Sequence, residues 1–135
     1  MNKSPFYLIL LLGSFIFLFS ACGKDSPTPS DARSSFLGRW RVTETKKNQT
    51  YDVEITADMN STNGVLIYKF GNFGSSIAAG ASVSGNTITL DADQEIVSGI
   101  IINGNGTLSN TKINWNYTIN DGADIITVTA IYTKI

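Results

Sequence analysis

The sequence predicts an all-β fold in which antiparallel strands follow one another as an up-and-down meander. Over residues 36–135, apolar and polar residues alternate in several runs, and turn dipeptides such as Asn63-Gly64 and Asp121-Gly122 separate these runs. A meander of about eight or nine strands removes its exposed edges most simply by closing, so we expect a small eight-stranded barrel. A two-sheet β-sandwich is the alternative, because alternation alone does not distinguish closure from stacking.

The chain begins with the pattern of an export signal. Residues 1–21 combine a short start carrying Lys3 with an apolar stretch over 6–19, which is too short for a comfortable membrane span. The small residue Ala21 precedes Cys22, the only cysteine of the chain. We therefore interpret residues 1–21 as a signal peptide that is cleaved between Ala21 and Cys22. An ordinary secretory signal, or a membrane helix with an incidental cysteine, is the alternative.

This stretch resembles a bacterial lipoprotein signal with its lipobox, in which the cysteine thiol is acylated and the cysteine becomes the mature N-terminus. Phe19 departs from that pattern, which prefers Leu, Val or Ile at this position. The resemblance implies that acyl chains such as palmitate on Cys22 anchor the protein to the lipid bilayer, at the bacterial outer membrane. Two or more acyl chains make a durable anchor.

Residues 22–35 are predicted to form a lipidated cysteine followed by a flexible tether. Proline, serine and charged residues dominate this segment, and Ala32 is its only aliphatic residue, so we expect an extended, solvated chain. Lys24-Asp25 resembles a weak form of the acidic signal that sends lipoproteins of the Bacteroidota to the cell surface. The same two charges are equally expected in any solvated linker, which leaves a periplasmic and a surface location both open.

Residues 36–135 are predicted to form a single barrel domain. In the first hairpin, Arg39 and Arg41 are expected to share the outer face with Asp52 and Glu54. These opposite charges help to set the register, and each pair is expected to stabilise the hairpin by about 0.5 kcal/mol. The expected strands lie near 38–45, 50–56, 64–70, 76–83, 86–91, 96–102, 105–109, 112–119 and 124–134.

The first strand begins with Gly38-Arg39-Trp40, which resembles the Gly-x-Trp motif of lipocalins and other calycins. The resemblance implies that Trp40 closes one end of an eight-stranded barrel and that Lys134 is the basic residue stacked on it. The downstream chain resembles the small lipocalin-like domains of Bacteroidota lipoproteins, including a Gly-x-Gly-Thr-Leu turn over 104–108 and a final Tyr-Thr-Lys over 132–134. The second lipocalin motif, Thr-Asp-Tyr, is absent, and the domain is short for a transport lipocalin.

The interior of such a small barrel is just wide enough for side chains or one small ligand. Trp115, Tyr117 and Tyr132 are expected to point inward and to fill most of it, while Ala79 and Ala81 leave one wall unusually small. We favour the interpretation that the small residues make room for the large ones opposite. The alternative is a shallow apolar pocket lined by these five residues.

Composition argues against catalysis. The chain has no histidine and no cysteine besides Cys22, so the common general base, the thiol nucleophile and the usual zinc ligands are missing. Asn103-Gly104-Asn105-Gly106 contains a Gly-x-Gly pattern, but no helix follows it, so it lacks the helix N-terminus of a phosphate-binding loop. We interpret it as a turn or a bulged strand corner. The acidic residues Asp91, Asp93 and Glu95 lack the spacing of a calcium loop and are interpreted as a solvated loop. We therefore predict neither an enzyme nor a cofactor or metal site.

The charge balance argues against nucleic acid as a partner. The full chain carries 10 basic and 11 acidic residues, and removal of residues 1–21 takes away Lys3, which leaves a formal charge of −2. We expect a non-enzymatic binding or interaction module held at the membrane. The alternatives are a carrier of a small apolar ligand and an inhibitor or accessory subunit of a cell-envelope complex, for which Phe73 is the candidate exposed contact.

Overall fold

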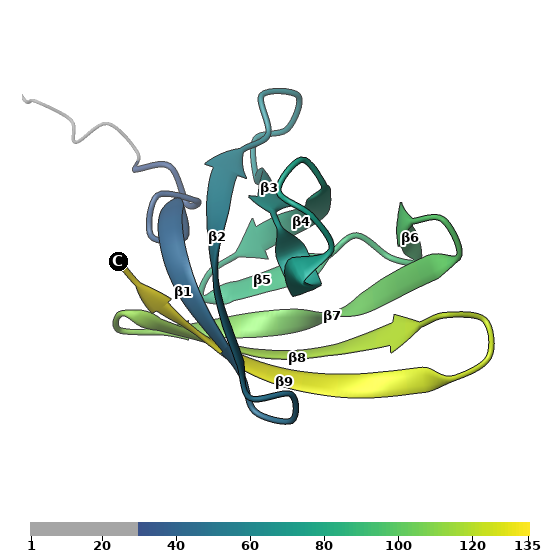
Figure 1. The fold of residues 1–135 in the computed structure, drawn as a ribbon. Helices are drawn as coiled ribbons and strands as arrows, with labels where there is room; N and C mark the ends of the chain where they lie inside the picture. The colour runs from purple at the N-terminus through teal and green to yellow at the C-terminus, as the bar shows by residue number, and fades with distance from the viewer. Residues whose placement is uncertain (1–29) are drawn as a thin grey trace, which may run out of the picture.

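Nine strands form a single antiparallel sheet in the computed structural model, which describes residues 30–135 (Figure 1). The strands are β1 (Gly38–Glu44), β2 (Gln49–Ala57), β3 (Gly64–Tyr68), β4 (Ala78–Ser84), β5 (Thr87–Leu90), β6 (Gln94–Val97), β7 (Ile100–Ser109), β8 (Lys112–Asn120) and β9 (Ile125–Lys134). A short 3-10 turn, η1 (Phe70–Asn72), lies between β3 and β4.

Two pairings close the sheet into a barrel. Within β1–β5 and within β7–β9, each strand pairs with the next along the chain. The two closing pairings join β9 to β1 and β5 to β7. Eight strands therefore form the ring, and β6 pairs with β7 outside it. The predicted eight-stranded antiparallel barrel is confirmed, and the β-sandwich alternative is wrong because one continuous ladder passes through every strand of the ring.

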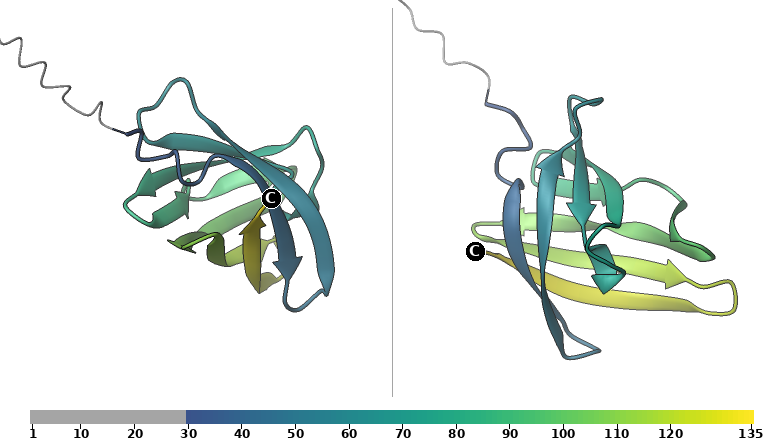
Figure 2. Two further views of the ribbon diagram at one scale, coloured as in Figure 1. Left: turned by 90° about the vertical axis from the view of Figure 1, so that its left-hand side faces the viewer. Right: turned by 45° about the horizontal axis from the view of Figure 1, so that its top comes forward.

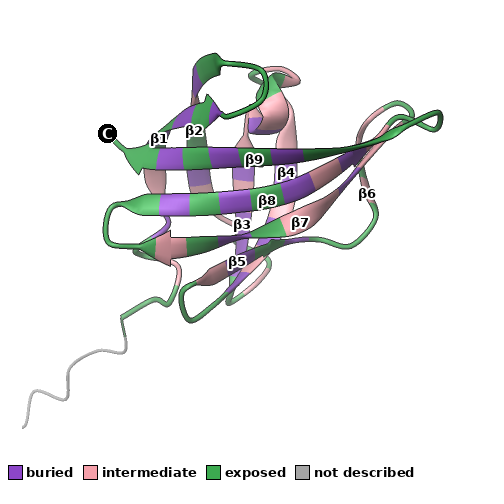
Figure 3. Ribbon diagram, turned by 90° about the horizontal axis from the view of Figure 1, so that it is seen from below, coloured by how far each residue is buried: buried purple, intermediate pink, exposed green. Residues whose placement is uncertain are grey.

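Every second residue along a strand points into the core, because successive side chains of a strand lie on opposite faces of the sheet. On β8, Ile113, Trp115, Tyr117 and Ile119 are buried between exposed or half-buried polar residues. Figure 3 shows the same banding along β8 and β9. The pattern that predicted these strands thus reports which side chains face the barrel interior.

Because neighbouring strands run antiparallel, the connections alternate between two ends of the barrel. At the entry end, β1 begins beside the end of β9, and Figure 2 shows the C-terminus next to this point. The entry end comprises 30–37, 58–63, 85–86, 110–111 and the C-terminus. The far end comprises the connections 45–48, 69–77, 91–99 and 121–124.

The register of the first hairpin follows its outer charges. Arg41 lies opposite Asp52, and its Nε and a terminal nitrogen donate to the carboxylate at 3.0 and 3.3 Å. Arg39 lies opposite Glu54 in the ladder but makes its ion pair with Asp52, at 3.5 Å. The shared outer face is confirmed, with Asp52 as the acceptor for both arginines.

The two strands expected at 96–102 and 105–109 are wrong. A single strand, β7, covers Ile100–Ser109, so Gly104 and Gly106 lie inside it rather than at a turn. They face Tyr117 and Trp115 across the ladder. A Cβ on Gly104 would lie 2.5 Å from the Tyr117 Cα, and one on Gly106 would lie 2.8 Å from the Trp115 ring. These glycines make room for the aromatic side chains of the neighbouring strand.

Gly104→Ala is expected to lower the free energy of unfolding by about 2 kcal/mol, because the added methyl group overlaps the backbone of β8. Gly85→Ala is the matched control: Gly85 also has a positive φ, +57°, but no atom lies within 4 Å of the place that an added Cβ would occupy. Gly104 has φ +152°, and the control measures the cost of a side chain at a positive φ without steric overlap, about 1 kcal/mol. Chemical denaturation of both variants checks this, and equal losses would contradict the steric explanation.

The packed part of the chain extends further toward the N-terminus than the predicted boundary at residue 36. Asp31 to Phe36 forms a turn in which the Ser34 N–H donates to the Asp31 carbonyl at 2.9 Å and the Phe36 N–H to the Arg33 carbonyl at 2.8 Å. The last residues assigned to an extended tether are therefore folded back. Their local hydrogen bonds outweigh the preference of this composition for a solvated chain.

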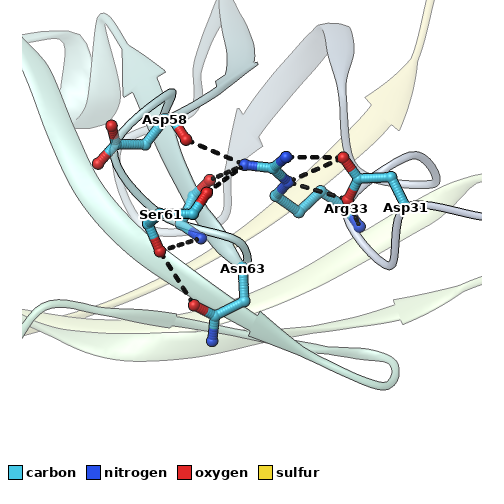
Figure 4. Close-up of polar contacts among 6 residues, drawn as sticks. Asp31, Arg33, Asp58, Ser61 and Asn63 are labelled. Carbon is cyan, nitrogen blue, oxygen red and sulfur yellow. Dashed lines mark hydrogen bonds and ion pairs between the residues drawn. The ribbon is translucent and has the colours of Figure 1, made fainter.

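Arg33 attaches this turn to the barrel (Figure 4). One of its terminal nitrogens donates to the carbonyl oxygens of Asp58, Ser61 and Gly64, at 3.0, 2.8 and 3.1 Å. Its Nε and other terminal nitrogen pair with the Asp31 carboxylate, the latter at 2.7 Å. Hydrogen bonds from Arg33 lower the pKa of Asp31 to about 2. The turn is thus held against the β2–β3 loop at the entry end.

Candidate functional site

The entry end of the barrel is closed by Trp40. Its side chain is buried, and its indole N–H donates to the Phe36 carbonyl at 2.7 Å. The Lys134 ammonium lies 4.5 Å from the centroid of the Trp40 ring and donates to the Leu37 carbonyl. The structure therefore brings together Gly38, Trp40 and Lys134, with Gly38 at φ +111° beside the lysine.

All five residues predicted to line a pocket lie in the core: Ala79, Ala81, Trp115, Tyr117 and Tyr132. The Trp115 and Tyr132 rings pack with their centroids 5.5 Å apart. Contacts at this distance are those of a packed aromatic pair. Trp115 and Tyr132 therefore contact each other directly, and all five residues belong to one buried core cluster.

Phe70 fills the interior from the far end, which sequence reasoning missed. The strand expected over 64–70 ends at Tyr68, because Lys69 adopts a left-handed conformation with φ 63°. Phe70 follows in η1, is fully buried, and places its ring centroid 5.6 Å from Trp115 and 4.8 Å from Tyr117. The barrel is thus closed by an aromatic side chain at each end.

A buried carboxyl group lies among three tyrosines. Glu44 is 1 % exposed, and its Oε1 accepts hydrogen bonds from the hydroxyls of Tyr51 at 2.7 Å and Tyr117 at 3.0 Å. Among the described residues, the Glu44 Oε2, the Tyr132 hydroxyl and the Trp115 indole N–H have no hydrogen-bond partner. The interior therefore contains a small polar cluster within an otherwise apolar core.

The three tyrosines keep their protons over the ordinary pH range. Burial raises the pKa of Tyr51, Tyr117 and Tyr132 well above the ordinary value, and the nearby Glu44 adds to this effect. Tyr51 and Tyr117 consequently remain donors to the carboxyl group. The signal for Glu44 was present in the sequence, because it follows Trp40 and Val42 at the same parity on β1.

The outer surface carries a hollow of about 180 Å³ beside β1, β2 and β3. Its lining mixes opposite charges with an aromatic ring: Arg39, Asp52, Val53, Glu54, Tyr68, Lys69 and Ser75. Asp52 is already paired with two arginines. The hollow offers a polar surface for contacts, and no sequence motif pointed to it.

Phe73 does not form the exposed aromatic patch expected of an accessory subunit, because it is half-buried and packs against the core. The large apolar residues that are exposed lie elsewhere: Met59, Ile125, Ile126, Ile131 and Ile135. In the acidic loop, Asp93 is bonded to Asn103 through its backbone N–H and its carboxylate, at 2.8 and 2.9 Å. The described residues contain no group of three or more side chains suited to hold a metal ion.

The predicted lipidation and cleavage site, Ala21 and Cys22, lies outside the described residues, as does the signal peptide over 1–21. Within residues 30–135, no helix has the length and hydrophobicity needed to cross a membrane. Neither a protein-family model nor a curated protein matches the chain.

Proposed function

We propose that this protein is a lipoprotein of the bacterial outer membrane, anchored by acyl chains on Cys22. Its lipocalin-like barrel acts as a non-enzymatic module that contacts an envelope partner through its outer surface. The observation that carries this proposal is the aromatic filling of the barrel by Phe70, Trp115, Tyr117 and Tyr132. An interior occupied by its own side chains leaves the outer surface to make contacts.

A carrier of a small apolar ligand is less well supported by this interior. Trp40 is buried at the entry end, and Phe70 is buried at the far end. A ligand would have to displace Phe70 from Trp115 and Tyr117, and it would then meet the polar cluster around Glu44. Titration of the unaltered protein with small apolar fluorescent probes tests this point. Saturable uptake into the interior would favour a carrier over a surface-binding module.

Cys22→Ala tests the anchor. The substitution removes the thiol that would be acylated, so we expect complete loss of metabolic labelling by radioactive palmitate and loss of the protein from the outer-membrane fraction. Lys24→Ala is the matched control, since it changes a neighbouring residue without touching the thiol, and it is expected to keep the label. Continued palmitate labelling of the Cys22→Ala chain would refute the assignment.

A further inference from the structure

Strand β9 pairs with β8 along one edge and with the shorter strand β1 along the other. Its pairing with β8 runs from Ile125 to Thr133, whereas its pairing with β1 covers only residues 130–134. One further bond, from the Thr45 N–H to the Thr129 carbonyl at 3.1 Å, follows the last pair with β1. Among the described strands, none pairs with this edge over 125–128, which we call the open edge. Figure 1 shows β8 and β9 running on past the β1–β2 hairpin.

The open edge presents backbone groups ready to pair. Thr129 directs its carbonyl toward β1, so Ile125 and Thr127, four and two residues earlier, direct their N–H and C=O groups to the same side. Natural edge strands are usually protected by lysine, proline or a bulge. Here the four residues are Ile, Ile, Thr and Val, all with high strand propensity, and Ile125 and Ile126 are 69 % and 46 % exposed.

Opposite charges flank the two ends of this edge. The β1–β2 turn, which carries Lys46 and Lys47, lies at the end marked by Thr129. The β8–β9 turn, which carries Asp121 and Asp124, lies at the other end. When two such edges meet antiparallel about a two-fold axis, each acidic turn comes next to the basic turn of the other copy. The edge is therefore complementary in charge to itself.

We propose that the open edge of β9 pairs antiparallel with the same edge of a second copy, so that one sheet continues across two barrels. The charge pattern selects this partner, because a two-fold interface must be self-complementary. In the register centred on Ile126, the backbone of Ile125 pairs with that of Thr127 in the other copy. The two Ile126 side chains then lie directly opposite each other. This inference goes beyond the proposed function and does not depend on the lipid anchor.

Ile126→Cys in the full chain, followed by mild oxidation of cell envelopes, tests the register. Side chains directly opposite in neighbouring strands have Cβ atoms about 4.5–5.5 Å apart, close enough for a disulfide after a small adjustment. We expect most of the protein to run at twice the monomer mass on a non-reducing gel. Ile131→Cys is the matched control, since Ile131 is also exposed on β9 but lies where β1 and β8 occupy both edges. The unaltered chain controls for Cys22.

A dimer yield for Ile126→Cys no higher than for Ile131→Cys would overturn the proposal. So would a crosslink formed solely with a different envelope protein, which would identify the occupant of the edge as another chain. Both readouts use the protein in its own membrane.

A charge exchange provides a second test that needs no cysteine. One variant carries Lys46→Glu and Lys47→Glu, and the other carries Asp124→Lys; Asp121 is kept because its carboxylate accepts from the Ala123 and Asp124 N–H groups at 2.9 and 2.8 Å. The variant with both lysines replaced is expected to lose the dimer in sedimentation of the detergent-extracted full chain, because both turns are then acidic. Asp124→Lys alone is expected to weaken the dimer, because it removes the net negative charge of the acidic turn. Mixing the two is expected to restore it, because one turn-to-turn contact then joins the native lysines to the native aspartates, and the other places the introduced lysine beside the introduced glutamates. A mixture as monomeric as its components would overturn the proposal.

Discussion

Phe70→Ala is expected to lower the free energy of unfolding by about 3–5 kcal/mol, the largest effect that we expect from any single substitution in this barrel. Phe70 is fully buried, and its ring packs against Trp115 and Tyr117 with centroid distances of 5.6 and 4.8 Å. Truncation to alanine removes these contacts and leaves a cavity that the strands of a closed barrel cannot easily collapse into. Denaturant titration followed by tryptophan fluorescence measures the loss.

The same variant connects stability to the proposed function. The cavity left by Phe70→Ala is expected to bind a small apolar probe of about benzene size, and the unaltered barrel is expected not to bind it. Phe73→Ala is the matched control, because Phe73 lies in the same connection but is half-buried. If the unaltered protein bound the probe as tightly as Phe70→Ala, the interior would not be filled and a carrier would be the better explanation.

Glu44→Ala is expected to lower the free energy of unfolding by about 3 kcal/mol, because two buried tyrosine hydroxyls lose their acceptor. The Tyr51 and Tyr117 hydroxyls both donate to the Glu44 Oε1, and all three side chains are buried. A donor left unpaired in the core lowers the free energy of unfolding by about 1–3 kcal/mol, whereas a hydrogen bond that is formed contributes a smaller net stabilisation. Thermal and chemical denaturation at neutral pH measure the effect.

Two sets of controls separate the hydrogen bonds from lost volume. Glu44→Gln keeps a carbonyl acceptor of the same shape and is expected to lose less stability than Glu44→Ala. Tyr51→Phe and Tyr117→Phe remove one donor each and are expected to cost about 1 kcal/mol apiece. In combination with Glu44→Ala, either tyrosine substitution is expected to cost less than alone, because the donor it removes is already unpaired. A loss below about 0.5 kcal/mol for Glu44→Ala, typical of a surface position, would contradict this account.

The alternation of residue types predicted most of the strands because the side-chain period of a strand is a local property. The run from Ile113 to Ile119 has this period, and the structure buries the residues it marks. Of the two interpretations of the segment around Gly104 and Gly106, a turn or a bulged strand corner, the turn was wrong for an equally physical reason. Glycine is typical of turns when only its own backbone is considered, and its role here depends on Tyr117 and Trp115 in a neighbouring strand.

Two residues of the interior illustrate what sequence reasoning missed. Glu44 lies at an inward position of β1, but a carboxyl group is rarely buried, and only the two tyrosine donors explain its place. Phe70 was expected at the end of a strand, yet the left-handed conformation of Lys69 ends β3 earlier and turns the next residue into the barrel. Both depend on contacts between segments far apart in the chain.

The sequence by itself determined the class of fold, the inward face of strands such as β8 and the inward direction of Trp115, Tyr117 and Tyr132, because these follow from the two-residue period and from hydrophobicity. Only the tertiary structure decided closure through β5 and β7, the plug formed by Phe70 and the open edge of β9. Strand length and register depend on pairing between distant segments. Local composition carries no information about where one strand stops and its neighbour runs on.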